Sequence, residues 1–97
     1  MRRAAQIDEN QPEIVKALRD AGCSVEPIHR HGQGIPDLLV GFRRQNLLLE
    51  VKDGNKPPSR RVLTPDEALW HLRWRGQVEV VETIEQALRA VGLEVAR

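Results

Sequence analysis

The sequence predicts an α/β fold in which a mixed β-sheet is flanked by helices, formed by one domain spanning residues 1–97. Two observations carry this prediction. Two apolar runs, residues 37–42 and 46–52, are joined by a short polar turn. Segments with helical spacing precede and follow them. The expected order is helix, three strands, helix, strand, helix, and the length suits one modest core.

The first helix is expected over residues 10–21. Asn10 can serve as its N-cap, Pro12 lies in the first turn where a missing N–H is harmless, and Gly22 can end it. Its apolar face consists of Ile14, Val15, Leu18 and Ala21. Residues 23–29 then form a short strand, followed by a loop over residues 30–34.

The two apolar runs predict an antiparallel hairpin with a turn at Arg43, Arg44 and Gln45. Their apolar residues are continuous instead of alternating, which is typical of strands packed on both faces. A loop over residues 53–63 follows. Thr64 and Glu67 then form a capping-box pattern around Pro65 and predict a helix that ends before Gly76. A strand over residues 78–81 and a helix over residues 83–91 complete the fold.

Composition excludes several protein classes. No apolar run is long enough to cross a membrane, and the N-terminal residues lack the apolar stretch of a signal peptide. The single cysteine, Cys23, cannot form an internal disulfide and is expected in the core. These features favour a cytoplasmic protein that does not contact membranes.

The formal net charge of +1 says less than the distribution of charge. Basic residues surround the second apolar run, as an enzyme acting on a polyanion would need. The alternative is that they are solvated surface side chains. The basic residues concerned are Arg2, Arg3, Arg43, Arg44, Lys56, Arg60, Arg61, Arg73 and Arg75.

Three charged residues stand at the ends of the predicted hairpin strands. Asp37 begins the first strand, and Glu50 and Lys52 end the second. The start of one antiparallel strand lies beside the end of its partner, so Asp37 is expected close to both. Because side chains alternate, Glu50 and Lys52 point the same way and Val51 points to the opposite face.

Two adjacent carboxylates repel each other unless one takes a proton or a cation lies between them. Hard oxygen ligands favour Mg²⁺ or Mn²⁺ over zinc, and the backbone carbonyl of Val51 could add a further ligand. Lys52 could orient a water molecule or stabilise the charge that develops in phosphoryl transfer. The alternative is a structural salt bridge at the end of the sheet.

The spacing of Pro36-Asp37 and Glu50-Val51-Lys52 resembles the core motif of PD-(D/E)XK nucleases. The segments "GIPDLLVG", "LLLEVKDG", "KPPS", "LTPDE" and "WRGQV" resemble the VRR-NUC (virus-type replication-repair nuclease) branch, in particular its small stand-alone phage and bacterial members. The resemblance covers nearly the whole chain. It implies a restriction-endonuclease-like fold and metal-dependent hydrolysis of DNA phosphodiesters. It also implies a homodimer, similar to Holliday-junction resolvases in selecting DNA structure.

This resemblance assigns Asp37 and Glu50 as metal-binding carboxylates and Lys52 as the catalytic lysine. It also implies an acidic residue on the first helix, which is matched to Glu13, with Glu9 as the second choice. The chain departs from the "LTPxQ" motif, because Glu67 stands where a glutamine is usual. Glu67 either contacts the scissile phosphate or the metal-bound water, or only caps its helix.

Other residues are candidates for DNA contact. Gln33, between two glycines, could reach the substrate backbone, and phosphate contacts are expected for Lys56, Arg60 and Arg61. His29 and His31 are interpreted as solvent-facing or phosphate-contacting, with metal ligation as the alternative. Trp70 and Trp74 share a helix face and serve either packing, in the core or a dimer interface, or base stacking.

We therefore expect a Mg²⁺- or Mn²⁺-dependent endodeoxyribonuclease. Its expected substrate is branched DNA such as Holliday junctions, and its setting is DNA repair in a bacterial or phage-infected cell. The alternative hypothesis is an inactive nucleic-acid-binding module on a nuclease fold. The Asp, Glu and Lys set favours the enzyme, because two carboxylates facing a polyanion would weaken simple binding.

Overall fold

The computed structural model describes residues 7–95, and its element order confirms the expected one apart from two short 3₁₀ helices. The 3₁₀ helices are η1, His29–His31, and η2, Pro58–Arg60. The regular elements are α1 (Gln11–Asp20), β1 (Ser24–Pro27), β2 (Leu38–Phe42), β3 (Gln45–Val51), α2 (Pro65–Arg73), β4 (Val78–Val81) and α3 (Ile84–Ala90).

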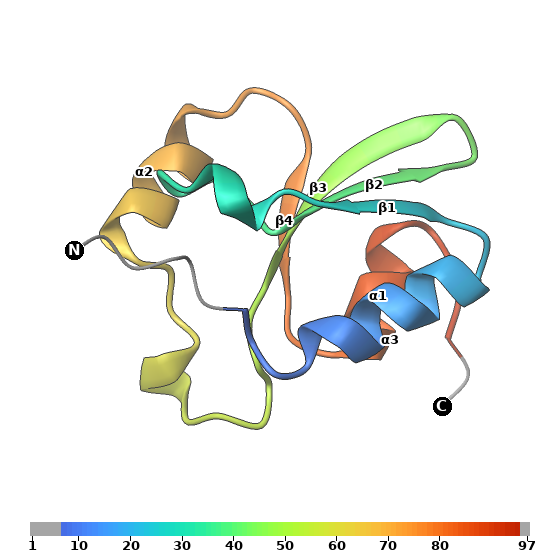
Figure 1. Cartoon of the computed structure of the whole chain (residues 1–97), viewed down its shortest axis with the longest axis horizontal. Coiled ribbons are helices and arrows are strands. Elements are labelled where there is room, and N and C mark those ends of the chain that lie inside the picture. The colour runs from blue at the N-terminus through green and yellow to red at the C-terminus, as the bar shows by residue number, and fades with distance from the viewer. Residues whose placement is uncertain (1–6, 96–97) are drawn as a thin grey trace.

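The four strands form one mixed sheet in the order β1-β2-β3-β4. The first two pairs are antiparallel and β3 pairs with β4 in parallel. Helices α1 and α3 lie side by side beyond one face of the sheet, and α2 lies on the other side (Figure 1). The predicted mixed sheet flanked by helices is therefore confirmed.

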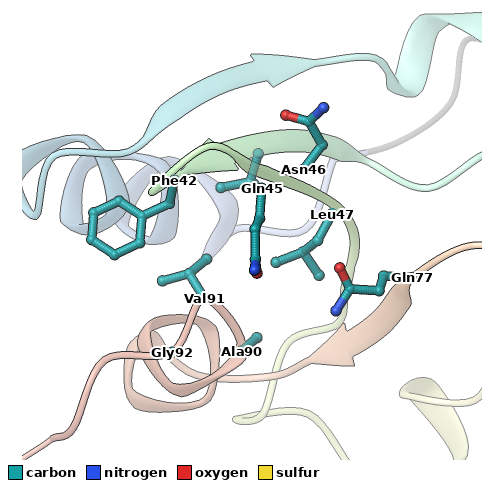
Figure 2. A pocket seen from close by; sticks show the side chains of 9 residues that line it. Phe42, Gln45, Asn46, Leu47, Gln77, Ala90, Val91 and Gly92 are labelled. Atoms are coloured by element: carbon teal, nitrogen blue, oxygen red, sulfur yellow. The ribbon is translucent and has the colours of Figure 1, made fainter.

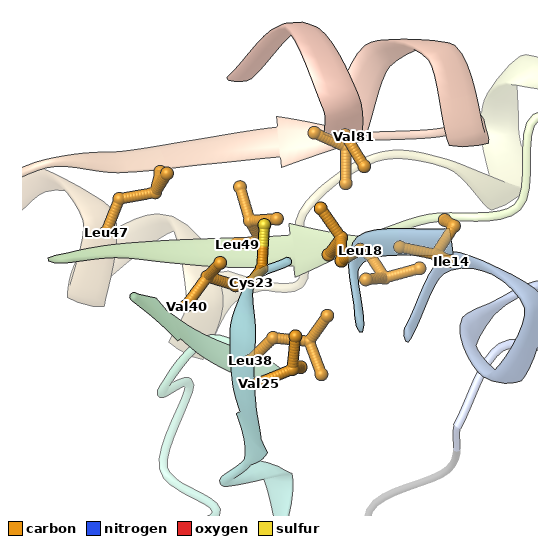
Figure 3. Packing of buried hydrophobic residues seen from close by; sticks show 11 residues of the cluster. Ile14, Leu18, Cys23, Val25, Leu38, Val40, Leu47, Leu49 and Val81 are labelled. Carbon is orange, nitrogen blue, oxygen red and sulfur yellow. The ribbon is translucent and has the colours of Figure 1, made fainter. Parts of the chain in front are cut away.

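The core lies between the sheet and the α1–α3 layer (Figure 3). Helix α1 contributes Ile14 and Leu18, which are completely buried, as its helical spacing predicts. Cys23 is buried in this cluster, as expected. Helix α3 contributes Ala87, and the strands supply Val25, Leu38, Val40, Leu47, Leu49, Val51 and Val81.

Strand β3 is packed on both faces, as its continuous apolar run predicts, and every residue from Leu47 to Val51 is buried. The same prediction is wrong for β2. Leu39 points to the α2 side of the sheet and keeps 39% of its surface exposed. Helix α2 has only nine residues and leaves that part of the sheet open.

The hairpin turn contains two residues instead of the predicted three. Arg43 and Arg44 both have positive φ, at 51° and 66°, and Gln45 already pairs with Phe42. Turns of this kind match the right-handed twist of the strands. The Arg43 guanidinium lies 4.8 Å from the centre of the Phe42 ring, which adds a cation–π contact beside an otherwise strained backbone.

Asn10 begins α1 but does not cap it with its side chain, contrary to the prediction. Its Nδ2 instead donates hydrogen bonds to the carbonyl oxygens of Lys52, at 2.9 Å, and Glu82, at 3.1 Å. These two residues directly follow β3 and β4. The side chain thus ties the start of α1 to the end of the sheet where the predicted site lies.

The capping box of α2 is confirmed. Thr64 Oγ1 accepts a hydrogen bond from the Glu67 N–H, and Glu67 Oε1 accepts one from the Thr64 N–H. The helix ends at Arg73, two residues before the predicted end, because Trp74 has an extended backbone. Among residues 7–95, no helix has the length and apolar character that crossing a bilayer requires.

Candidate active site

Strand register brings Asp37 and Glu50 together. Leu38 pairs with Leu49 at the end of the β2–β3 ladder, so Asp37 stands opposite Glu50 one step further on. Both side chains belong to the α2 side of the sheet, since the buried Leu38 and Leu49 point to the core. The structure thus juxtaposes the two carboxylates, as the sequence predicted.

A backbone hydrogen bond fixes the Asp37 carboxylate. Its Oδ2 accepts from the Val51 N–H at 2.8 Å. Pro36, directly before it, is buried and restricts the entry of the chain. Burial raises the pKa of Asp37, and the hydrogen bond from the Val51 N–H lowers it by a smaller amount, so the pKa is raised overall. One carboxylate oxygen is thus committed to the fold.

Glu50 is buried in an unfavourable setting for a charge. Only 2% of its surface is exposed, and its Oε1 has no hydrogen-bond partner among the described residues. Burial, followed by the charge of Asp37, raises its pKa to about 10. A cation between the two carboxylates would remove both costs. The donor set therefore fits a hard divalent ion, with carboxylate oxygens as its ligands.

The site supplies two carboxylates and backbone oxygens, not a cage of side chains. No group of three or more His, Cys, Asp or Glu residues is arranged to hold a metal within residues 7–95. A sparse set of this kind suits Mg²⁺, which keeps several of its water molecules and shares its coordination with substrate phosphates. Asp37, Glu50 and the Val51 carbonyl remain the candidate ligands.

Lys52 lies beside this pair and is itself buried, with 8% of its surface exposed. Its Nζ is 2.7 Å from Glu67 Oε1 and 3.6 Å from Glu50 Oε2. Burial alone would lower the pKa of Lys52, but the hydrogen bond and charge of Glu67 outweigh it and raise the pKa. The lysine is therefore held as an ammonium ion.

Glu67 joins α2 to the site. The sequence left open whether it caps its helix or contacts the chemistry, and the structure shows the cap together with an ion pair to Lys52. Burial would raise the pKa of Glu67, but the hydrogen bonds from Lys52 and the Thr64 N–H lower it below its usual value. Glu67 is therefore a charged neighbour of Lys52.

The structure does not bring Glu13 into hydrogen-bond or ion-pair contact with Asp37, Glu50 or Lys52 within the described chain. Glu13 is exposed and lines a hollow beside Asn10 and Asp53. Glu9, the second choice, is also exposed.

In the segment before α1, the acidic residue whose charge acts on Lys52 is Asp8. Its charge raises the pKa of Lys52, and this effect is smaller than the lowering by burial and the raising by Glu67 and Glu50. Sequence reasoning missed Asp8 because it precedes the helix. The buried Asn10, which anchors the same segment to Lys52, was interpreted only as a cap.

The predicted DNA-binding residues lie in different settings. Lys56 Nζ is 3.4 Å from Asp8 Oδ1, and Arg61 Nη1 is 3.0 Å from Glu82 Oε1, so both are paired within the protein. Arg60, at the end of η2, is exposed. Gln33 is also exposed and has a positive φ of 58°. Arg60 and Gln33 are thus the freest of these four side chains to meet a ligand.

The two tryptophans stack on each other, with ring centres 4.7 Å apart and planes inclined by 20°. Together with Ile35, Leu39 and Leu48 they line an apolar groove on the α2 side of the sheet. Trp74 keeps 45% of its surface exposed. The arrangement shows packing on the sheet and leaves Trp74 accessible for further contacts.

Another hollow lies near the opposite end of β3, between the β2–β3 hairpin and the end of α3 (Figure 2). Gln45 and Leu47 point into it from the hairpin, facing Val91. Its lining is amide and apolar, with no ionisable side chain. It begins at the start of β3, whereas Glu50 is near the end of that strand, so it is separate from the candidate site.

No family model and no curated protein matches the chain. A solved structure described as "VRR_NUC domain" does match, with a TM-score of 0.61 and 27% sequence identity. The match covers 84% of this chain and 94% of that one. The chain has a VRR-NUC-type fold. The resemblance seen in the sequence motifs is thus confirmed by structure, and it indicates a nuclease domain.

The VRR-NUC-type fold explains why the charged residues meet. It places the start of β2, the end of β3 and the first turn of α2 at one end of the sheet.

His29 and His31 fall in η1, directly before the loop that enters β2, and His31 is exposed. His71, four residues after Glu67 on α2, was not singled out by the sequence. Burial lowers its pKa, and its Nε2 is buried without a partner in the described residues.

Proposed function

We propose that this protein is a Mg²⁺- or Mn²⁺-dependent endodeoxyribonuclease. The observation that carries the proposal is the opposed pair Asp37 and Glu50, with Lys52 beside it, in a VRR-NUC-type fold. The buried Glu50 carboxylate, with an unsatisfied oxygen and the half-buried Asp37 beside it, costs stability, and a divalent cation would compensate for this cost. A divalent cation can polarise a phosphodiester and activate the attacking water, which is the chemistry that hydrolysis of DNA requires.

The chain's own residues have separable tasks in this reaction. Asp37 and Glu50 would hold the ion, together with the carbonyl of Val51. When bound, a divalent ion lowers the pKa of water and offsets the charge on the phosphate oxygens. The Lys52 ammonium lies within reach of the same place and stabilises negative charge that develops on the phosphate. Arg60 and Gln33 would hold the flanking DNA backbone.

Branched DNA is the proposed substrate and a homodimer the proposed assembly. The exposed apolar residues of α2 and of its C-cap support an interface: Leu72 is 81% exposed, and Leu69 and the C-cap Trp74 are about half exposed, at 51% and 45%. Two-fold symmetry would present two sites to the symmetric strands of a four-way junction. Light scattering of the wild type and Leu72→Glu tests the assembly, and an equal monomeric mass for both would contradict it.

The activity is tested with end-labelled four-way junction, 5′-flap and duplex DNA of matched sequence. Each is incubated with Mg²⁺, with Mn²⁺ or with EDTA. We expect cuts that depend on the metal and favour the branched substrates, as DNA repair in a bacterial or phage-infected cytoplasm would require. Equal cutting of all three substrates would contradict the structure selectivity. Binding without cutting under any metal would support the binding module instead.

A further inference from the structure

One oxygen of Glu67 joins the N-terminus of α2 to the residue that follows β3. Its Oε1 accepts a hydrogen bond from Lys52 Nζ at 2.7 Å and another from the Thr64 N–H at 2.8 Å. The Glu67 N–H in turn donates to Thr64 Oγ1 at 3.2 Å. The carboxylate is thus fixed by its own helix terminus while it binds the lysine that follows β3.

The first turn of α2, which carries Glu67, packs tightly against the loop before β2. A Cβ added to Gly34 would lie 2.3 Å from the carbonyl oxygen of Asp66 and 2.9 Å from the backbone nitrogen of Glu67. Only a glycine permits this approach, and its φ of 84° also favours glycine. The close approach of Gly34 fixes the backbone of Glu67, and the Thr64 N–H fixes its carboxylate.

Electrostatics explains why Lys52 needs this partner. Its second contact is Glu50, at 3.6 Å, which is one of the candidate metal ligands. A divalent ion held by Asp37 and Glu50 would take up the charge of that carboxylate and repel a nearby ammonium. Glu67 is not part of the ligand pair, so its negative charge remains available to Lys52 in a low-dielectric setting.

We propose that Glu67 is a positioning residue that holds the Lys52 ammonium beside the carboxylate pair. The inference rests on the proposed nuclease function and deepens it at the position where the chain departs from the "LTPxQ" motif. Glu67 acts through Lys52, and its capping hydrogen bond serves to fix the carboxylate. A side chain that offers an acceptor oxygen at this place should preserve part of the effect, and one that offers none should not.

Three variants separate positioning from capping. Glu67→Ala removes the partner of Lys52 and one capping bond. Glu67→Gln keeps an acceptor oxygen but removes the charge. Thr64→Ala is the matched control, because it removes the Thr64 Oγ1 contact and leaves the Glu67 carboxylate beside Lys52 and the Thr64 N–H. Kcat, KM and the Mn²⁺ concentration for half-maximal cleavage are measured on the substrate that the wild type prefers.

We expect Glu67→Ala to lower kcat by roughly 10- to 100-fold, the range typical of losing a residue that orients a functional group. KM and the Mn²⁺ concentration for half-maximal cleavage should stay within about threefold of the wild type. Glu67→Gln should recover much of that loss, and Thr64→Ala should keep nearly the full kcat while lowering the unfolding temperature. An equal loss of kcat in Thr64→Ala and Glu67→Ala would overturn the proposal, since capping alone would then explain it. So would a Glu67→Gln enzyme faster than the wild type.

A second readout does not depend on activity. Hydrogen-bonded lysine ammonium groups exchange slowly, so Lys52 should give a distinct ¹H–¹⁵N ammonium signal in the metal-free protein, assigned by its loss in Lys52→Met. The signal should persist in Thr64→Ala and vanish in Glu67→Ala. If the wild type cleaves no DNA, the nuclease proposal fails, and this spectrum still decides whether Glu67 holds Lys52. Persistence of the signal in Glu67→Ala overturns the positioning role.

Discussion

The side chain of Asp37 accepts a hydrogen bond from the backbone N–H of Val51, at 2.8 Å, just beyond the last paired residues of the β2–β3 ladder. The carboxylate therefore takes the place of the backbone carbonyl that a longer strand would offer. One oxygen extends the sheet, and the carboxyl group lies beside Glu50. Asp37 thus has a structural and a chemical task that substitution can separate.

Asp37→Asn should abolish cleavage and leave the fold intact. The amide oxygen can still accept from the Val51 N–H, but the residue no longer carries a charge for a divalent ion. We expect a loss of at least about 100-fold in kcat/KM and a change of no more than about 1 kcal/mol in the free energy of unfolding. Steady-state cleavage and urea unfolding measure the two effects. Undiminished cleavage by Asp37→Asn would refute the assignment.

The metal-free protein should lose stability as pH rises. The pKa of Glu50 is raised from 4.5 in the unfolded chain to about 10 in the folded one. Between those values the folded protein holds a proton that the unfolded chain releases. The stabilisation is thus complete below pH 4.5 and is lost progressively toward pH 10. For one proton the slope is at most about 1.4 kcal/mol per pH unit.

Thermal unfolding in EDTA at about pH 6 and about pH 8.5 measures this slope within the titration window. Glu50→Gln is the control, because its amide cannot ionise, and its unfolding temperature should depend less on pH. Saturating Mn²⁺ should flatten the slope of the wild type in the same way. Identical pH slopes for the wild type and Glu50→Gln would show that Glu50 does not govern the titration.

Gly34→Ala should damage the site through the backbone. The added Cβ would collide with the Asp66 carbonyl at the first turn of α2, in addition to the strain of a positive φ. Gly92→Ala is a matched control, because Gly92 has a φ of 96° and open space around its Cβ position. Both variants should lose about 1 kcal/mol from the left-handed conformation. Only Gly34→Ala should lose more than that and also lose cleavage, and equal behaviour of the two would contradict the packing argument.

The acidic residue at the start of α1 can be identified by comparing Asp8→Asn with Glu13→Gln. Asp8 contacts Lys56 and its charge acts on Lys52, whereas Glu13 is exposed beside Asp53. We expect Asp8→Asn to lower kcat/KM by roughly tenfold and Glu13→Gln to change it by less than about threefold. The reverse order would restore the match of Glu13 that the sequence suggested.

The parts of the site that follow from strand geometry could be predicted from the sequence. Asp37, Glu50 and Lys52 meet because antiparallel pairing and side-chain alternation leave few other arrangements. The capping box at Thr64 and Glu67 was also predictable, because it depends on only four consecutive residues. Both features depend on residues that are close in the sequence or that lie on directly paired strands.

Contacts between distant segments could not be predicted in this way. Nothing local shows that Glu67 reaches Lys52, that Gly34 packs on Asp66, or that Asn10 binds the carbonyls after β3 and β4 instead of capping its helix. These contacts depend on how α1 and α2 pack against the sheet. The exposure of Leu39 was missed for the same reason, because its spacing is that of a buried strand and only the short length of α2 leaves it open.

We propose above all that the opposed carboxylates of Asp37 and Glu50 hold a divalent cation. Mn²⁺ binding, followed by electron paramagnetic resonance of the free ion, tests it without any substrate. We predict one Mn²⁺ site per chain in the wild type and in Glu13→Gln, and weakening of at least about tenfold in Asp37→Asn and in Glu50→Gln. Equal Mn²⁺ affinity in all four proteins, or no binding to the wild type, would contradict the claim.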